Sequence, residues 1–206
     1  MDRIIDICFK HRLSHIGSCL TTYPILEHIY TTKCKDDVVI LSAGHAGIAQ
    51  YVILEKMYGH NAEELYLKHG IHPHRDIDNG LHVSSGSLGS AILIAVGMAF
   101  ADTKKQIHCV ISDGECGEGS VWEALSFIQT NNLKNIKVHV NMNGYSAYDT
   151  VDVVYLKNKL IAFLPDIIIW NTGYPDVEFM NGLKAHYHIL NEKDKTELVD
   201  AIINLN

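Results

Sequence analysis

The stretch that decides the fold is Gln106–Asp149, which reads QIHCVISDGECGEGSVWEALSFIQTNNLKNIKVHVNMNGYSAYD. Two short apolar runs, Ile107–Ser112 and Ile136–Asn141, have the composition of strands, and each leads into a turn signal. Apolar residues at helical spacing between them predict a helix over Ser120–Asn132. The simplest unit is therefore a strand–helix–strand crossover with parallel strands.

The two turns place Asp113 and Asn143 at the carboxyl ends of neighbouring parallel strands. Open α/β sheets bind their ligands at that edge. Carboxylate and amide oxygens are hard donors that suit Mg²⁺ or Ca²⁺, and Mg²⁺ often also binds phosphate oxygens of a substrate. The pair therefore predicts a metal-bridged diphosphate. On these residues alone, two ordinary turns without a ligand are the alternative.

Composition narrows the class of protein. The 206 residues are 47% apolar and 20% charged, which predicts one domain over residues 1–206 with a sizeable core. The net charge of −7 and the absence of a long basic run argue against nucleic acid as a partner. The chain has five cysteines without C-x-x-C spacing, which predicts a reducing, cytoplasmic compartment. Its amino terminus is unlike a signal peptide, and no apolar run is long enough to span a membrane, so we expect a chain that does not enter membranes.

Strand and helix signals alternate along the rest of the chain, which predicts an α/β fold with a mainly parallel sheet flanked by helices. The predicted strands outside the central stretch are Val38–Leu41 and Asp166–Trp170. The predicted helices are Asp2–Arg12, one from about Thr22 with Pro24 in its first turn, one closed by Gly59, one capped by Asn61, one from the Ser84–Gly89 loop to Ala101, and Asn191–Asn204. The helix that ends at Ala101 is apolar on nearly all sides, which predicts a buried central helix.

The chain resembles the transketolase family in motifs that occur in the family's order from about His11 to His188. The motifs are Ser14-His15-Ile16-Gly17, Leu41-Ser42-Ala43-Gly44-His45, His72-Pro73, Val83–Gly89, and Ser112-Asp113-Gly114 followed by Asn143. The resemblance implies a three-layer thiamine-diphosphate-binding fold. It points in particular to the diphosphate-binding amino-terminal half, which some organisms encode as a separate subunit.

The resemblance also implies roles for individual residues. The Asp113 and Asn143 side chains and the Tyr145 carbonyl would hold Mg²⁺ (or Ca²⁺) on the diphosphate. The other residues implied to bind the cofactor are His45, Gly86, Leu88, Gly114, Glu118 and Glu123, the last two near an interface. The histidines implied to line the substrate channel and to move protons are His15, His45, His72 and His186; His74 and His188 are open alternatives to the last two.

The implied activity is thiamine-diphosphate-dependent transfer of a two-carbon ketol unit from a ketose to an aldose, with sugars or sugar phosphates as substrates. In the family, a glutamate of a separate pyrimidine-binding domain activates the cofactor. We therefore expect a partner, the carboxy-terminal transketolase subunit, in a heterotetramer, and no activity from this chain alone. The alternatives are another thiamine diphosphate carboligase (an acyloin or deoxyxylulose-type synthase) and a non-catalytic scaffold.

Two departures from the family's pattern concern the predicted site and sheet. Ser112 replaces the first glycine of the Gly-Asp-Gly motif. The segment from Thr150 to Phe163 is short for the family, and we expect a strand and a helix to be missing there. A dinucleotide-binding enzyme is disfavoured, because no predicted strand is followed by the spacing G-x-G-x-x-G.

Overall fold

A computed structural model describes residues 1–173 and 175–203. Its sheet has four parallel strands in the order β1-β2-β3-β4. The strands are β1 (Val38–Leu41), β2 (Ile107–Ser112), β3 (Ile136–Met142) and β4 (Ile168–Asn171). Helix α6 (Gly119–Thr130) connects β2 to β3, so the predicted crossover and its parallel strands are confirmed.

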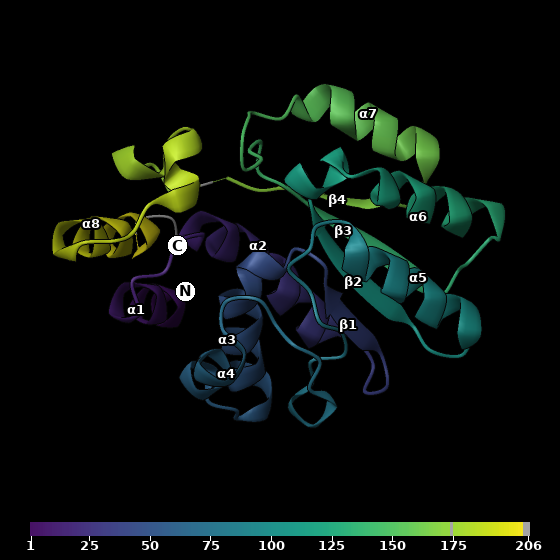
Figure 1. Cartoon of the computed structure of the whole chain (residues 1–206), viewed down its shortest axis with the longest axis horizontal. Coiled ribbons are helices and arrows are strands. Elements are labelled where there is room, and N and C mark those ends of the chain that lie inside the picture. The colour runs from purple at the N-terminus through teal and green to yellow at the C-terminus, as the bar shows by residue number, and fades with distance from the viewer. Residues whose placement is uncertain (174, 204–206) are drawn as a thin grey trace.

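Helices cover both faces of the sheet and make three layers (Figure 1). One face carries α1 (Asp2–Lys10), α2 (Ile16–Thr32), α3 (Gly47–Tyr58), α4 (Ala62–His69) and α8 (Glu192–Ile203). The other carries α5 (Ser90–Ala101), α6 and α7 (Val153–Phe163). The predicted α/β class with a mainly parallel sheet flanked by helices is therefore confirmed.

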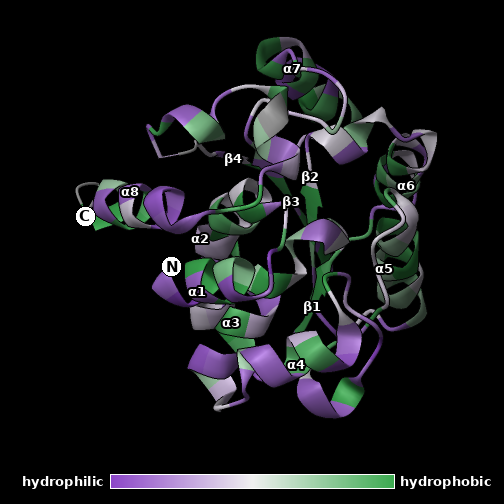
Figure 2. Cartoon of the chain, turned by 60° about the vertical axis from the view of Figure 1, so that its left-hand side comes forward, coloured by the Kyte–Doolittle hydropathy of each residue, from purple (hydrophilic) through white to green (hydrophobic). Residues whose placement is uncertain are grey.

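The strands are apolar because both of their faces are buried. Val39 and Leu41 pack into the core beneath α1–α4, whereas Val38 and Ile40 pack into the core beneath α5–α7. This alternation is the period of two that a strand imposes on its side chains. Figure 2 shows the green, apolar strands enclosed between the two helical layers.

The second helix begins earlier than its sequence predicts. It starts at Ile16 rather than near Thr22, so Pro24 lies inside the helix and not in its first turn. The Ser14–Ser18 segment reads as a polar break, but Gly17 and Ser18 are buried within the helix. Burial on most of its sides stabilises the helix beyond what local propensity indicates.

The prediction that α5 is buried on all sides is wrong for this chain. Its residues Leu93, Ile94 and Phe100 are 44%, 46% and 57% exposed, and the Phe100 ring contacts Phe127 of α6 at a centroid distance of 5.5 Å. Only one side of α5 packs on the sheet, through residues such as Ile92. An apolar sequence indicates that a helix favours burial, but it does not indicate whether this chain or another one buries it.

The segment from Thr150 to Phe163 contains α7, so the prediction of a missing helix is wrong; every residue of this segment is described, and none of them forms a strand.

The helix caps match their predictions. Gly59 ends α3 with φ 75°, and the Asn61 side chain accepts from the N–H groups of Glu63 and Glu64. The Asn191 side chain accepts from Asp194 N–H before α8, and the predicted end of that helix at Asn204 lies outside the described residues.

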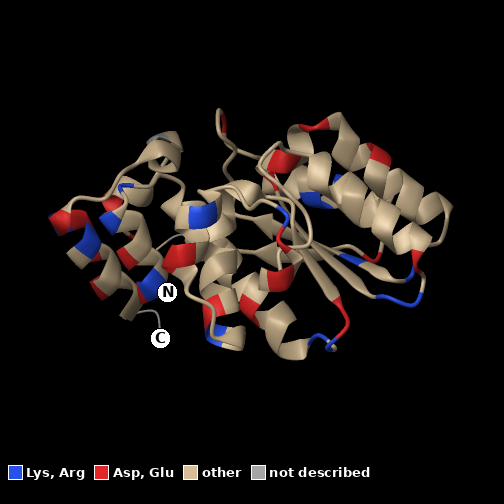
Figure 3. Ribbon diagram, turned by 60° about the horizontal axis from the view of Figure 1, so that its bottom comes forward, with Lys and Arg blue, Asp and Glu red and all other residues tan. Residues whose placement is uncertain are grey.

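Charge is unevenly distributed between the two helical layers (Figure 3). Helices α1 and α8 carry acidic and basic residues, joined by the Lys195–Asp6 ion pair at 2.7 Å. Helix α5 has no charged residue, and α6 has only Glu123. Within the described part of the chain, no helix is long and apolar enough to cross a membrane. All five cysteines are free thiols.

Candidate active site at the carboxyl edge of the sheet

The tips of β2 and β3 lie side by side, with Ser112 in register with Asn141. The Asp113 carboxylate bridges the two tips. It accepts from Gly114 N–H at 2.9 Å and from Gly144 N–H at 2.6 Å. The side chain is buried, and burial raises the pKa of the carboxyl to about 6 although these backbone hydrogen bonds oppose the shift.

The Asn143 side chain lies in the turn after β3. Its Oδ1 accepts from Tyr145 N–H at 3.0 Å, and its Nδ2 donates to Thr21 Oγ1 of α2 at 3.4 Å. The Tyr145 carbonyl oxygen faces Gly114, at 3.5 Å from where a Cβ would stand on that glycine. One carboxylate, one amide and one carbonyl therefore gather around the two tips, and all are hard oxygen donors.

A cleft of about 650 Å³, part of it open to solvent, lies over these tips. Its lining includes nine of the residues predicted from the sequence: His15, His45, His72, Gly86, Leu88, Gly114, Asn143, Tyr145 and His186. Asp113 lies just behind this wall, bonded to Gly114. The remaining lining residues are Ser18, Ser112, Ser146 and Ala147, and the predicted set lacked Ser18, Ser146 and Ala147. Ser146 and Ala147 lie in the same turn as Asn143 and Tyr145, so their place in the sequence could have predicted that they line the cleft.

Three imidazoles from distant parts of the chain meet in the cleft. The ring centroids of His15 and His186 are 4.4 Å apart, and those of His15 and His45 are 5.6 Å apart. Burial first, and then the neighbouring imidazoles, lower the pKa of His15 to about 4 and that of His45 to about 3. Burial also lowers the pKa of His186. All three rings are therefore neutral near pH 7, and a neutral imidazole can both accept and donate a proton.

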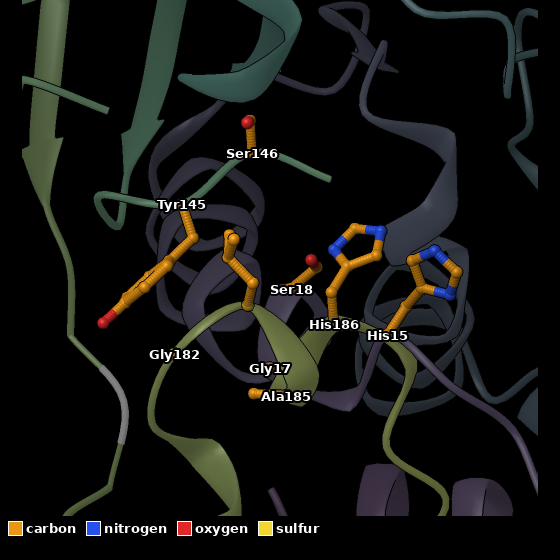
Figure 4. A pocket seen from close by; sticks show the side chains of 9 residues that line it. His15, Gly17, Ser18, Tyr145, Ser146, Gly182, Ala185 and His186 are labelled. Carbon is orange, nitrogen blue, oxygen red and sulfur yellow. The ribbon is translucent and has the colours of Figure 1, made fainter. Parts of the chain in front are cut away.

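His15 has an unusual backbone. It caps α2 with φ 66°, and its N–H donates to the His186 carbonyl at 3.2 Å. A non-glycine residue in this left-handed region is uncommon and often lies at a functional site. Figure 4 shows the His15 and His186 side chains side by side, with Ser18 on the other side of His186; these residues and Tyr145 line a smaller hollow.

The structure distinguishes between the histidine alternatives. His186 lines the cleft, whereas His188 Nε2 bonds to Asp194 Oδ2 at 2.8 Å and its ring stacks on Phe179. His72 also lines the cleft. His74 is not among the cleft residues and lies near the His69 ring, at a centroid distance of 6.3 Å.

The two predicted glutamates do not join the cleft in this chain. Glu118 is exposed and lies beside the start of α5, where its Cβ is 2.9 Å from the position of a Cβ on Gly89. Glu123 is exposed on α6, on a shallow surface with Trp122 and Phe127. Glu118 therefore lies where α5 and α6 begin, whereas Glu123 lies on the α6 surface that Phe163 of α7 also lines.

Two features of the glycine loop before α5 fit a bound group. A Cβ on Gly86 would stand 2.8 Å from the His72 ring, so glycine is the residue that lets the loop backbone lie this close to that ring. The Ser85 hydroxyl next to it is buried, and no hydrogen-bond partner for it is found among the described residues. Together with the oxygen donors at the strand tips, this cradle suits a phosphorylated ligand and a divalent cation. Over residues 1–173 and 175–203 there is no cluster of three or more His, Cys, Asp or Glu side chains that could hold a metal unaided.

These features define a three-layer α/β domain with a ligand-binding cleft at the carboxyl edge of its sheet. The family of the amino-terminal part of 1-deoxy-D-xylulose-5-phosphate synthase matches residues 2–169, and the chain belongs to this family. The predicted resemblance to the transketolase family, through the amino-terminal half of a split enzyme, is confirmed by the relatives described next.

The chain is 27% identical over 194 residues to an apulose-4-phosphate transketolase subunit of Phocaeicola vulgatus, covering 82% of this chain and 68% of the relative. It is 28% identical over 156 residues to a 6-deoxy-6-sulfo-D-fructose transketolase subunit of a Clostridium species, covering 65% of this chain and 56% of the relative. Human transketolase is 32% identical over 159 residues, with 66% of this chain and 25% of that enzyme covered. The chain thus spans most of the first relative, about half of the second and a quarter of the third.

The structure of transketolase from Leishmania mexicana superposes on this chain with a TM-score of 0.78. The match covers 96% of this chain and 39% of that one, at 21% identity. At this identity the likeness shows the fold alone. It confirms that the predicted three-layer fold is that of part of a transketolase.

Proposed function

We propose that this chain is the diphosphate-binding subunit of a two-chain transketolase, which transfers a two-carbon ketol unit from a ketose to an aldose. The observation that carries the proposal is one cleft in which the Asp113 turn, the Asn143 turn and the imidazoles of His15, His45, His72 and His186 meet. Subunits named for this activity in two bacteria match the chain over most of its length or nearly two thirds of it. Sugars or sugar phosphates are the proposed substrates.

Thiamine diphosphate is the proposed cofactor, with Mg²⁺ or Ca²⁺ on its phosphates. The Asp113 carboxylate, the Asn143 amide oxygen and the Tyr145 carbonyl would hold the cation, and Gly114 N–H would donate to the diphosphate. The raised pKa of Asp113 supports this role, because a buried carboxylate without a cation has only backbone N–H groups to stabilise its charge. Gly86 and Leu88 would contact the cofactor through their backbone.

The bound cofactor would supply the electron sink that carbon–carbon cleavage requires. The chain's own residues would position the sugar and move protons. Neutral His15, His45 and His186 can accept a proton from a sugar hydroxyl and return it to a carbonyl oxygen near pH 7. His72 would orient the substrate from beside the Gly86 loop.

A partner chain with the pyrimidine-binding domain, the carboxy-terminal subunit, is part of the proposal, in a heterotetramer. The exposed apolar side of α5 and α6, formed by Leu93, Ile94, Phe100 and Phe127, supports a partner. Exposed apolar surface of this kind marks protein–protein contacts. Helix α5, which carries three of these residues, begins two positions after Leu88 of the cleft lining. Glu118 and Glu123 would then lie at the interface.

The test is to purify the chain alone and together with the proposed carboxy-terminal subunit. We expect ketol transfer, and metal-dependent binding of thiamine diphosphate in titration calorimetry, from the complex only. Transfer at a normal rate by the isolated chain would contradict the need for a partner. A complex that binds no cofactor in the presence of Mg²⁺ would support the scaffold alternative and overturn the proposal.

The family match favours one second candidate, a deoxyxylulose-type carboligase. The two activities consume different donors, a ketose in one case and an α-keto acid in the other. Assaying the complex with both donor classes separates them, and consumption of the α-keto acid alone would favour the second candidate.

A further inference from the structure

A carboxylate with no role in the proposed chemistry lies directly beneath the cleft. Glu115, in the 3-10 turn Gly114–Gly117 after β2, is 0% exposed and does not line the cleft. A buried carboxylate is costly unless its oxygens accept hydrogen bonds. The contacts of Glu115 therefore show which parts of the molecule it holds.

Those contacts join three separate segments. Oε1 accepts from the Ser42 hydroxyl at the end of β1 and from Gly89 N–H, 2.8 Å away, at the start of α5. Oε2 faces Ser112 N–H at the end of β2, at 3.4 Å, and Glu115 N–H donates back to Ser112 Oγ at 3.2 Å. One side chain thus joins two strand ends to a helix start.

Each of the three segments continues into the cleft within a few residues. Ser42 precedes His45 by three positions, Gly89 follows Gly86 and Leu88, and Ser112 precedes the Asp113-Gly114 turn. Gly89 has φ 74°, so its N–H orientation depends on a backbone conformation that the Glu115 bond holds. A shift in any one segment would therefore move His45, the Gly86 loop or the Asp113-Gly114 turn away from the other two.

We propose that Glu115 is a positioning residue, whose buried carboxylate holds the end of β1, the loop before α5 and the end of β2 in the arrangement that binds the cofactor's diphosphate. The identity of the ligand rests on the proposed function. That Glu115 holds the three segments together does not depend on the proposed function. Glu115 is fully buried and does not line the cleft, so it acts through the segments that it holds. The bonds to Ser42 and Gly89, both through Oε1, carry the effect.

Two substitutions separate the acceptor from the volume it fills. Glu115→Met keeps a chain of similar length but removes both oxygens, leaving Gly89 N–H and the Ser42 hydroxyl without an acceptor. Glu115→Gln retains an amide oxygen that can replace Oε1 for both donors. Glu192→Gln makes the same chemical change at an exposed position of α8 and is the matched control.

The first measurement is hydrogen exchange of the Gly89 amide in the full chain without ligand. We expect exchange at least tenfold faster in Glu115→Met, and within threefold of wild type in Glu115→Gln and Glu192→Gln. The second measurement is the affinity of the complex with its partner for thiamine diphosphate and Mg²⁺. We expect at least a tenfold loss in Glu115→Met, with Glu115→Gln restoring it to within threefold.

Cofactor affinity within twofold of wild type in a folded Glu115→Met variant would overturn the inference, as would a Glu115→Gln variant as weak as Glu115→Met. If Glu115→Met does not fold, Ser42→Ala decides, since it removes only the bond to β1: a threefold or greater loss supports the inference, and wild-type affinity overturns it. A wild-type complex that binds no thiamine diphosphate refutes the proposed function instead. Exchange at Gly89 still tests the geometric part in that case.

Discussion

The Asp113 carboxylate accepts a hydrogen bond of 2.6 Å from the backbone N–H of Gly144, which lies 31 positions further along the chain. This bond fastens the turn after β2 to the turn after β3. The second carboxylate oxygen accepts from Gly114 N–H at 2.9 Å. The residue proposed to bind the cation therefore also holds together the two turns that border the cleft. A substitution at Asp113 should change both cofactor affinity and stability, and the two effects can be measured separately.

Replacing Asp113 tests the proposed cation site. Asp113→Ala removes the carboxylate that bridges the strand tips and should weaken binding of thiamine diphosphate with Mg²⁺ at least about a hundredfold, or about 2.7 kcal/mol. It also leaves two N–H groups without acceptors, which costs about 1–3 kcal/mol of stability. Calorimetry in the complex and urea unfolding of the chain measure the two effects.

Asp113→Asn is the matched variant, because it keeps one acceptor and the shape of the side chain. We expect it to be more stable than Asp113→Ala and to bind the cofactor with metal almost as poorly, since an amide is a weaker ligand for Mg²⁺ than a carboxylate. Cofactor affinity equal to wild type in both variants would refute the assignment of Asp113 as a metal ligand.

Gly86 tests the glycine loop. A Cβ at this position would stand 2.8 Å from the His72 ring, and the φ of 127° is strained for any other residue. We expect Gly86→Ala to lower cofactor affinity at least about tenfold and to destabilise the chain by about 1–3 kcal/mol. Gly97→Ala in α5, where a Cβ meets nothing within 4 Å, should instead stabilise the isolated chain by about 1 kcal/mol. Similar melting temperatures for the two variants would contradict this account.

The two candidate histidines at the end of the resemblance give opposite predictions. His186→Gln should lower kcat in the complex at least about tenfold with little change in stability, because the ring lines the cleft. His188→Gln loses the bond to Asp194 and should cost about 1 kcal/mol of stability with kcat unchanged. Steady-state kinetics and thermal unfolding of both variants decide, and the reverse pattern would assign the site to His188.

Much of this arrangement could be predicted because the strands are short apolar runs ended by turn residues. The bounds of β1 and β2 match their predicted residues, and the approach of Asp113 to the Asn143 turn follows from parallel strands alone. The order of motifs then predicted the cleft histidines, although only the structure distinguishes His186 from His188.

What could not be predicted depends on contacts between distant segments. The start of α2 is fixed by His15 in a left-handed conformation and by burial of Ser18, neither of which local spacing reveals. The burial of Glu115 could not be predicted, because an acidic residue next to a turn is usually exposed. Its partners Ser42 and Gly89 lie 73 and 26 positions away. The exposure of Phe100 could not be predicted either, since an apolar sequence does not show which side of a helix packs on the sheet.

A final prediction concerns stability and comes from two buried imidazoles in the sheet. Trp170 Nε1–H donates to His139 Nδ1 at 3.2 Å, so His139 carries its proton on Nε2 and donates to His108 Nδ1 at 3.1 Å. Burial first, then His108 and Lys137, lower the pKa of His139 to about 3. The other groups that face the pair are His28, against Trp170, and Asp37, 3.7 Å from His108.

Because the folded protein holds His139 neutral while the unfolded chain protonates it near its ordinary pKa of about 6.5, this residue stabilises the fold fully above that pH and less as the pH falls toward 3. Between pH 7 and pH 5 the loss from His139 alone is about 2 kcal/mol. His139→Gln cannot titrate and retains a donor and an acceptor for its two neighbours. Urea unfolding at pH 7, 6 and 5 should therefore show a shallower decline in the variant than in wild type. Parallel curves for the two proteins would mean that His139 is already protonated in the fold, or that water reaches it.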